Sequence, residues 1–118
     1  MCKYEQLEVM NLDQISNSIQ DTYTNFVLNK VNESCLRIAV ITGEYRWHYH
    51  ETCDEMFIVL EGELFIDFQD RPTIALKPHD VITIPKGVVH RTRALQRAVN
   101  LCFEHLDGDT VFIDESAL

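Results

Sequence analysis

Short apolar runs separated by turn residues recur along most of the chain and predict an all-β protein. The clearest run, Cys35 to Thr42, is rich in β-branched residues and ends at Gly43. The other predicted strands are residues 23–28, 48–50, 55–60, 64–68, 73–76, 81–84, 88–94, 98–104 and 110–113. Many short strands with turns between them are typical of a β-sandwich or β-barrel.

The beginning of the chain has a different pattern. Asn11 is a suitable N-cap with Gln14 three residues later, and a short helix over residues 11–19 would place three apolar side chains on one face: Leu12, Ile15 and Ile19. We therefore expect residues 1–30 to form an N-terminal segment, with this helix and the first strand, that packs on the barrel or on a partner. Residues 31–118 are expected to form the barrel itself.

Both faces of the predicted strand 55–60 are apolar. Phe57 and Val59 share one face, whereas the other carries Met56, Ile58 and Leu60. An apolar outer face needs a cover. We expect a homodimer in which a second subunit supplies it; the alternative is cover by residues 1–30 of the same chain.

Composition excludes several classes of partner. The 118 residues include 10 basic and 19 acidic side chains, a formal net charge of −9, which disfavours binding to nucleic acid or to an anionic membrane. The apolar runs are too short to cross a membrane, and the N-terminus lacks a secretory signal pattern. The 4 cysteines show no C-x-x-C spacing, which predicts reduced thiols and a cytoplasmic location.

Three histidines and a glutamate are the candidate metal ligands. His48 and His50 lie two residues apart, so in a strand their imidazoles point to the same face. Glu55 follows after a short polar stretch, and His90 lies downstream in the sequence Pro85 to His90. Imidazole and carboxylate ligands suit a divalent transition metal, and the candidates are Fe, Mn, Ni, Zn and Co.

These residues carry a resemblance to a known family. The chain resembles the small single-domain cupins, which fold as a double-stranded β-helix (jelly-roll barrel), including the mannose-6-phosphate-isomerase-like members. The first cupin motif reads here as Gly43, His48, His50, Glu55 and Gly62, with one residue fewer than usual between the first two. The second motif reads as Pro85, Gly87 and His90, with Ala94 in place of the usual asparagine and His79 or Asp80 in place of its leading glycine.

The resemblance implies a metal-binding cupin with His48, His50, Glu55 and His90 around one metal. The first hypothesis is a metal-dependent enzyme, dioxygenase- or isomerase-like, acting on a small molecule. The alternative is a non-catalytic module that binds a metal or a small ligand, since fold does not determine function. No inward-facing Lys or Arg is expected, which argues mildly against a phosphosugar isomerase.

Residues in phase with the predicted ligands should line the cavity. Phe57 and Val59 follow Glu55, while Val88 and Thr92 flank His90. Leu64, Ile66 and Phe68 are candidates for the opposite wall, so we expect a mostly apolar pocket.

The remaining notable side chains are interpreted structurally. Tyr45, Trp47 and Tyr49 alternate with the histidines and should lie on the opposite face. Arg91 and Arg93 are interpreted as solvated charges on the outer side. The last group is interpreted as turn or surface residues: Cys53, His79 and His105.

Overall fold

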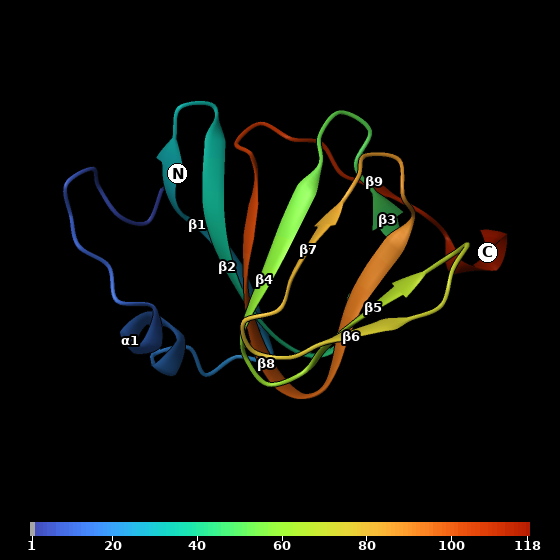
Figure 1. The fold of residues 1–118 in the computed structure, drawn as a ribbon, viewed down its shortest axis with the longest axis horizontal. Helices are drawn as coiled ribbons and strands as arrows, with labels where there is room; N and C mark the ends of the chain where they lie inside the picture. Colours follow the sequence, from blue (N-terminus) through green and yellow to red (C-terminus); the bar gives the residue numbers. More distant parts are fainter. Residues whose placement is uncertain (1) are drawn as a thin grey trace.

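The computed structural model describes residues 2–118, and its longest strand, β8 (His90–His105), is the centre of the sheet. Four strands pair with it, all antiparallel: β2 (Ser34–Glu44), β3 (His48–Tyr49), β4 (Glu55–Glu61) and β5 (Leu64–Phe68). The outer strands extend these pairs: β1 (Tyr23–Val31) joins β2, β6 (Ile74–Leu76) joins β5, β7 (Val81–Ile84) joins β4, and β9 (Val111–Phe112) joins β3. The sheet curls into the expected all-β jelly-roll barrel (Figure 1).

The sequence pattern suggested two separate strands over 88–94 and 98–104, and this was wrong. One continuous strand, β8, covers both. Its first residues pair with β5 and its later residues with β4, while β2 follows it along the other edge with a register shift between Ile41 and Gly43. Because β8 changes partners in this way, it contributes side chains to both ends of the barrel interior.

The N-terminal helix is confirmed as α1 (Leu12–Asn17). The Asn11 side chain accepts a 3.0 Å hydrogen bond from the backbone N–H of Gln14, which satisfies one of the free donors of the first turn. Ile15 is buried against Leu28 and neighbouring side chains on the outer face of the sheet. The helix therefore covers part of the apolar face that the sequence predicted.

A short 3₁₀-helix, η1 (Glu115–Ala117), lies at the C-terminus. No helix within residues 2–118 is long and apolar enough to cross a membrane.

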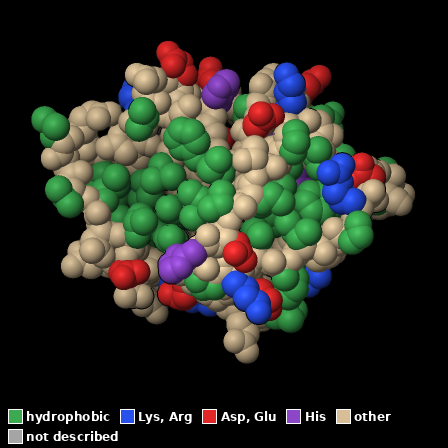
Figure 2. Space-filling model, viewed as in Figure 1, with side chains coloured by type: hydrophobic (Ala, Val, Ile, Leu, Met, Phe, Trp, Pro, Cys, Tyr) green, Lys and Arg blue, Asp and Glu red, His purple; other side chains and the backbone are tan. Residues whose placement is uncertain are grey.

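Cover of that outer face is incomplete. Ile58 and Leu60 of β4 pack against the cluster around Ile15, but Phe103 remains 40% exposed next to its strand neighbour Met56. Figure 2 shows a broad hydrophobic surface on the side of the molecule where β4 faces the viewer. A second apolar cluster, inside the barrel, contains Phe57, Val59, Leu64 and Ile66.

Candidate metal centre

The structure brings the four predicted ligand residues together. His48 lies on β3, directly opposite His90 at the start of β8, while His50 follows β3 and Glu55 begins β4. All four side chains are buried, and their ligand atoms lie within 4.8 Å of one another. Glu55 Oε1 is 2.9 Å from His50 Nε2 and 3.4 Å from His90 Nε2.

Each imidazole is oriented by a backbone carbonyl. The Nδ1 atoms lie 2.8 Å from Arg46 O for His48, 2.7 Å from Asp109 O for His50, and 2.9 Å from Val88 O for His90. A carbonyl oxygen only accepts hydrogen bonds, so each Nδ1 carries the proton and donates it. In the neutral ring this leaves the Nε2 lone pair directed at the centre of the cluster, the arrangement that metal-binding histidines require.

His90 Nε2 supplies an independent test of whether the residues fit a metal. The His90 side chain is 0% exposed, and within residues 2–118 this nitrogen has no hydrogen-bond partner. An unpaired buried polar atom costs free energy, and coordination to a cation would remove that cost. The donor set of three imidazole nitrogens and one carboxylate also suits a divalent transition metal. The cluster can therefore hold a metal ion, and the four residues remain our predicted ligands.

The electrostatics of the cluster favour a cation. Burial, with the neighbouring His90, lowers the pKa of His48 to about 4, so this ring is neutral at pH 7. Burial would also lower the pKa of His50, but its hydrogen bond and charge interaction with Glu55 outweigh burial and raise it to about 9. Burial opposes ionisation of Glu55, yet its hydrogen bond to His50 and its close contact with His90 hold the pKa of that carboxyl well below its usual range. At pH 7 the metal-free His50 ring is thus protonated and paired with an ionised, buried carboxylate, and a bound metal ion would replace that proton.

A cavity of about 340 Å³ opens beside the cluster, and His48, His50 and Glu55 form part of its wall. Phe57 and Thr92 line it, at the positions where the sequence placed them. The structure places Val59 and Val88 elsewhere: Val59 is fully buried in the barrel core, and Val88 packs against that core. Leu64 and Ile66 are also core residues, with Phe68 packed beside them.

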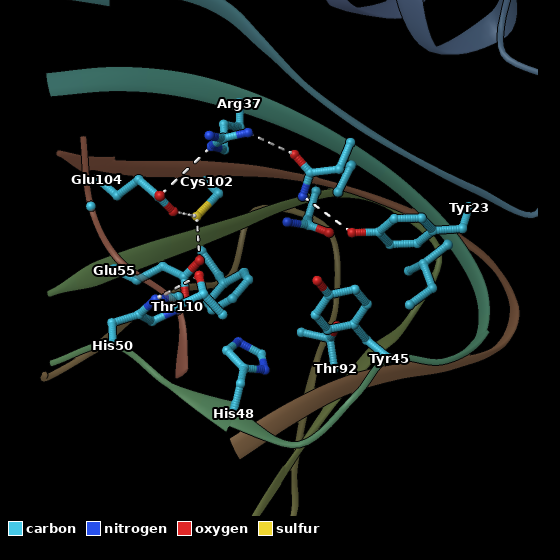
Figure 3. Close-up of a pocket in the computed structure, with 16 residues that line it drawn as sticks. Tyr23, Arg37, Tyr45, His48, His50, Glu55, Thr92, Cys102, Glu104 and Thr110 are labelled. Atoms are coloured by element: carbon cyan, nitrogen blue, oxygen red, sulfur yellow. Dashed lines mark hydrogen bonds and ion pairs between the residues drawn. The ribbon is translucent and has the colours of Figure 1, made fainter. Parts of the chain in front are cut away.

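The opposite wall is polar, which was not predicted from the sequence. It comes from β1, β2 and the second half of β8, and includes Tyr23, Asn25, Arg37, Asn100 and Glu104. The expectation that no Arg faces inward was wrong, because Arg37 points into the cavity from β2 (Figure 3). The pocket is therefore less apolar than predicted.

Tyr45 also differs from its predicted position. It lines the cavity and meets the His48 ring edge-on, with 5.4 Å between ring centroids. Tyr45 precedes β3, so the alternation of a strand does not apply to it. Trp47 is half-buried outside the cavity, where the Arg91 guanidinium stacks on its ring at 4.9 Å.

Arg91 and Arg93 are less solvated than predicted. Their Nε atoms donate hydrogen bonds of 2.9 and 2.8 Å to the same Asp67 oxygen, and their side chains are only 16% and 26% exposed. The Thr73 hydroxyl donates to the other Asp67 oxygen at 2.7 Å. This network lies on the outer side of β8 and β5 and fixes the segment that carries His90.

A thiol links Glu55 to a second carboxyl group. Cys102 Sγ lies 2.9 Å from Glu55 Oε2 and 3.2 Å from Glu104 Oε1. Burial and the two carboxylates raise the pKa of Cys102, and burial beside Glu55 raises the pKa of Glu104. Asn100, Cys102 and Glu104 alternate along the predicted strand 98–104, so their common face could have been inferred from the sequence. Glu104 gives the cavity a carboxyl group besides the predicted metal ligand.

His79 and His105 are exposed, as expected of surface residues, and Cys53 is buried in a turn. None of these three belongs to the four-residue cluster.

Comparisons with known proteins identify the family. The model of the cupin domain family matches residues 37–103. The chain belongs to the cupin family. Uncharacterized protein YdbB of Bacillus subtilis is 53% identical over 108 residues, which cover 92% of this chain and 96% of that protein. A cupin-2 domain protein from Shewanella frigidimarina has a similar structure, with 31% identity, a TM-score of 0.77, and coverage of 82% of this cupin and 94% of the other chain.

A more distant similarity concerns an enzyme. Acireductone dioxygenase of Candida albicans is 31% identical over 75 residues, which span 60% of this cupin but only 39% of that enzyme.

Proposed function

We propose that this cupin is a metal-dependent enzyme that acts on a small molecule bound in the 340 Å³ cavity. The observation that carries the proposal is the orientation of the three imidazoles: each Nδ1 is held by a backbone carbonyl, so the Nε2 atoms converge on Glu55. Hydrogen bonds of this kind fix the ring and its tautomer before a metal arrives. A purely structural cluster would not need an unpaired nitrogen such as His90 Nε2.

The metal, which we propose to be Fe, Mn, Ni, Zn or Co, would supply Lewis-acid activation of a substrate oxygen or reaction with O₂. The protein's own residues bind and orient the substrate. Phe57 and Tyr45 give the cavity apolar and aromatic walls, while Thr92, on β8 two residues after His90, offers a hydroxyl group. Glu104 places a carboxyl group where it can hold a proton beside the substrate.

We favour dioxygenase-like chemistry over isomerase-like chemistry. The similarity to acireductone dioxygenase supports this choice, although it covers only 39% of that enzyme. Arg37 weakens the argument against a phosphosugar isomerase, but one arginine supplies few contacts for a phosphate group.

Elemental analysis is the first test. Protein purified without a tag or chelator should contain close to one metal ion per chain, and the double variant His48→Ala/His50→Ala should contain almost none. With iron bound, we expect O₂ consumption with an enolic or phenolic substrate. If neither the purified protein nor protein reloaded with excess metal holds an ion, the proposal fails. If metal and ligand bind without turnover, the protein is a binding module instead.

We also propose a homodimer, formed through the outer apolar face of β4 and β8. Phe103 and Met56 are adjacent on neighbouring strands there, and helix α1 leaves them uncovered. Sedimentation should show a dimer that Phe103→Asp weakens at least tenfold. Leu95→Asp, at a 75% exposed position of β8 beyond the residues that pair with β4, should not change the mass. A monomeric parent protein would contradict the proposal.

We further propose a cytoplasmic location, because Cys35, Cys53 and Cys102 are buried free thiols. Fractionation of the native cell should recover the protein with the cytoplasmic enzymes; recovery outside the cell would contradict this.

A further inference from the structure

The cavity wall opposite His48 is a connected row of polar side chains (Figure 3). Arg37 Nη1 donates a 3.3 Å hydrogen bond to Asn25 Oδ1, and Asn25 Nδ2 lies 3.4 Å from the Tyr23 hydroxyl oxygen. The Tyr23 ring stacks on Tyr45, with 5.3 Å between centroids. Strands β1 and β2 thus hold a guanidinium, an amide and a phenol side by side on the wall that faces the predicted metal.

Arg37 retains capacity to bind a ligand. Its bond to Asn25 accounts for one of the five N–H donors of a guanidinium. Its Nε atom forms an ion pair with Glu104 Oε2 at 3.6 Å, longer than a normal hydrogen bond, and Glu104 also contacts Cys102. The Arg37 side chain is 30% exposed, so a molecule entering the cavity can reach it. The planar fork of N–H groups matches the two oxygens of a carboxylate.

We propose that Arg37 recognises a carboxylate on the ligand, so that the substrates are small monocarboxylic acids with a second oxygen group that reaches the metal. This inference rests on the proposed metal-dependent function and specifies its substrate class. Arg37 is the single Lys or Arg lining the cavity within residues 2–118. One cation matches one anionic group, and the net charge of −9 disfavours a more highly charged ligand.

Apolar side chains of the cavity also restrict which ligands can bind. Ile41, Phe57 and the Tyr45 ring also line the cavity. They favour a short apolar body in the molecule, because its burial contributes roughly 25 cal/mol per Å². The volume of about 340 Å³ excludes polymers and limits the ligand to a small molecule.

The test compares two probes that differ at one group, a charged carboxylate in the first and a neutral carboxamide in the second. The probes are succinic monohydroxamate, whose hydroxamate group chelates a metal, and the same compound with its carboxylate converted to a carboxamide. Calorimetric titration of cobalt-loaded protein should show at least tenfold tighter binding of the carboxylate. In Arg37→Gln this preference should fall below twofold, and Arg37→Lys should show an intermediate value because it keeps the charge but not the fork.

Arg71→Gln is the matched control. It also removes one guanidinium, but Arg71 is 52% exposed and pairs only with the adjacent Asp70. It should keep the full tenfold preference. Thermal melting of each variant checks that it is folded, and Arg37→Lys tests the inference if Arg37→Gln does not fold.

The outcomes separate the two proposals. Equal binding of both probes to the loaded protein, a preference that survives in Arg37→Gln, or no binding of either probe overturns the Arg37 inference while the metal site stands. If the protein takes up no metal, the proposed function fails. The metal-free protein is then titrated with succinamate, which carries one carboxylate, and with the neutral diamide succinamide, while the Arg37 Nε–H resonance is followed by NMR. A shift with succinamate alone supports carboxylate recognition, and no shift overturns it.

Discussion

The His50 ring is oriented by a residue 59 positions later in the chain: its Nδ1 lies 2.7 Å from the carbonyl oxygen of Asp109. The Asp109 carboxylate in turn accepts hydrogen bonds from the backbone N–H groups of Glu51 and Thr52, at 2.9 Å each, and from the Thr52 hydroxyl at 2.6 Å. One residue of the C-terminal loop therefore fixes both the ring and the chain that follows it.

Asp109→Ala should weaken metal binding about tenfold, because loss of its carboxylate loosens the carbonyl that orients His50. Competition with a chelator of known affinity measures the effect. Asp107→Ala is the control, since it removes the same charge from an exposed position in the same loop. Equal losses in both variants would show that net charge, not orientation, is responsible.

Metal should stabilise the fold through His90. At a free concentration of one hundred times its Kd, a metal that binds only the native state adds about 2.7 kcal/mol, which raises the Tm by roughly 10 °C. His90→Ala should remove most of this rise, whereas His105→Ala, at an exposed position, should keep it. Differential scanning calorimetry with zinc or with EDTA measures it. A full rise in His90→Ala would exclude this nitrogen as a ligand.

Ionisation of Asp67 should make the free energy of unfolding depend on pH in the acidic range. Burial opposes its ionisation, but bonds from Arg93, Thr73 and Arg91 outweigh burial and lower its pKa to about 2 from an ordinary value of 3.8. Because the folded pKa is the lower one, the stabilisation is complete above about pH 4 and is lost as pH falls towards 2.

Asp67→Asn should therefore reduce the free energy of unfolding by about 1–2 kcal/mol at pH 7. The difference from the parent protein should shrink between pH 4 and pH 2, as measured by urea unfolding at each pH. Asp70→Asn, which affects only an exposed pair with Arg71, should show little change. A difference that is constant across this pH range would contradict the assignment.

Substitution by alanine should lower the free energy of unfolding by different amounts at Gly62 and at Gly87. Both have positive φ, +77° and +85°. A Cβ at Gly87 would meet open space, so Gly87→Ala should cost only the backbone strain of about 1 kcal/mol. A Cβ at Gly62 would collide with the backbone of Arg97 and Ala98, which cannot move freely, so Gly62→Ala should cost about 2–4 kcal/mol. Urea unfolding measures both, and equal costs would show that the turn adapts.

Strand alternation and turn residues predicted the all-β fold and the common face of His48 and His50, because both depend on local pattern. The grouping of Glu55 and His90 with these two histidines was implied by the resemblance to the cupin motifs. The sequence could not predict the wall that contains Arg37. Which face of Cys35–Thr42 points inward depends on pairing with distant β8, and both faces of that segment carry apolar residues. Tyr45 was misplaced because alternation fails where a strand ends.

The pairing of β2 with β8 also has a consequence for how the protein reaches its native state. Ser34 at one end of the domain pairs with His105 at the other, so most of the sheet depends on contacts that are remote in sequence. Proteins dominated by such contacts fold in milliseconds to seconds. Pairing of the start of β8 with β3 also places His90 beside His48. A metal ion added during refolding should therefore bind only after β3 and β8 have paired. The rate of metal binding, followed by absorption of the bound ion, would then report the rate at which the barrel closes.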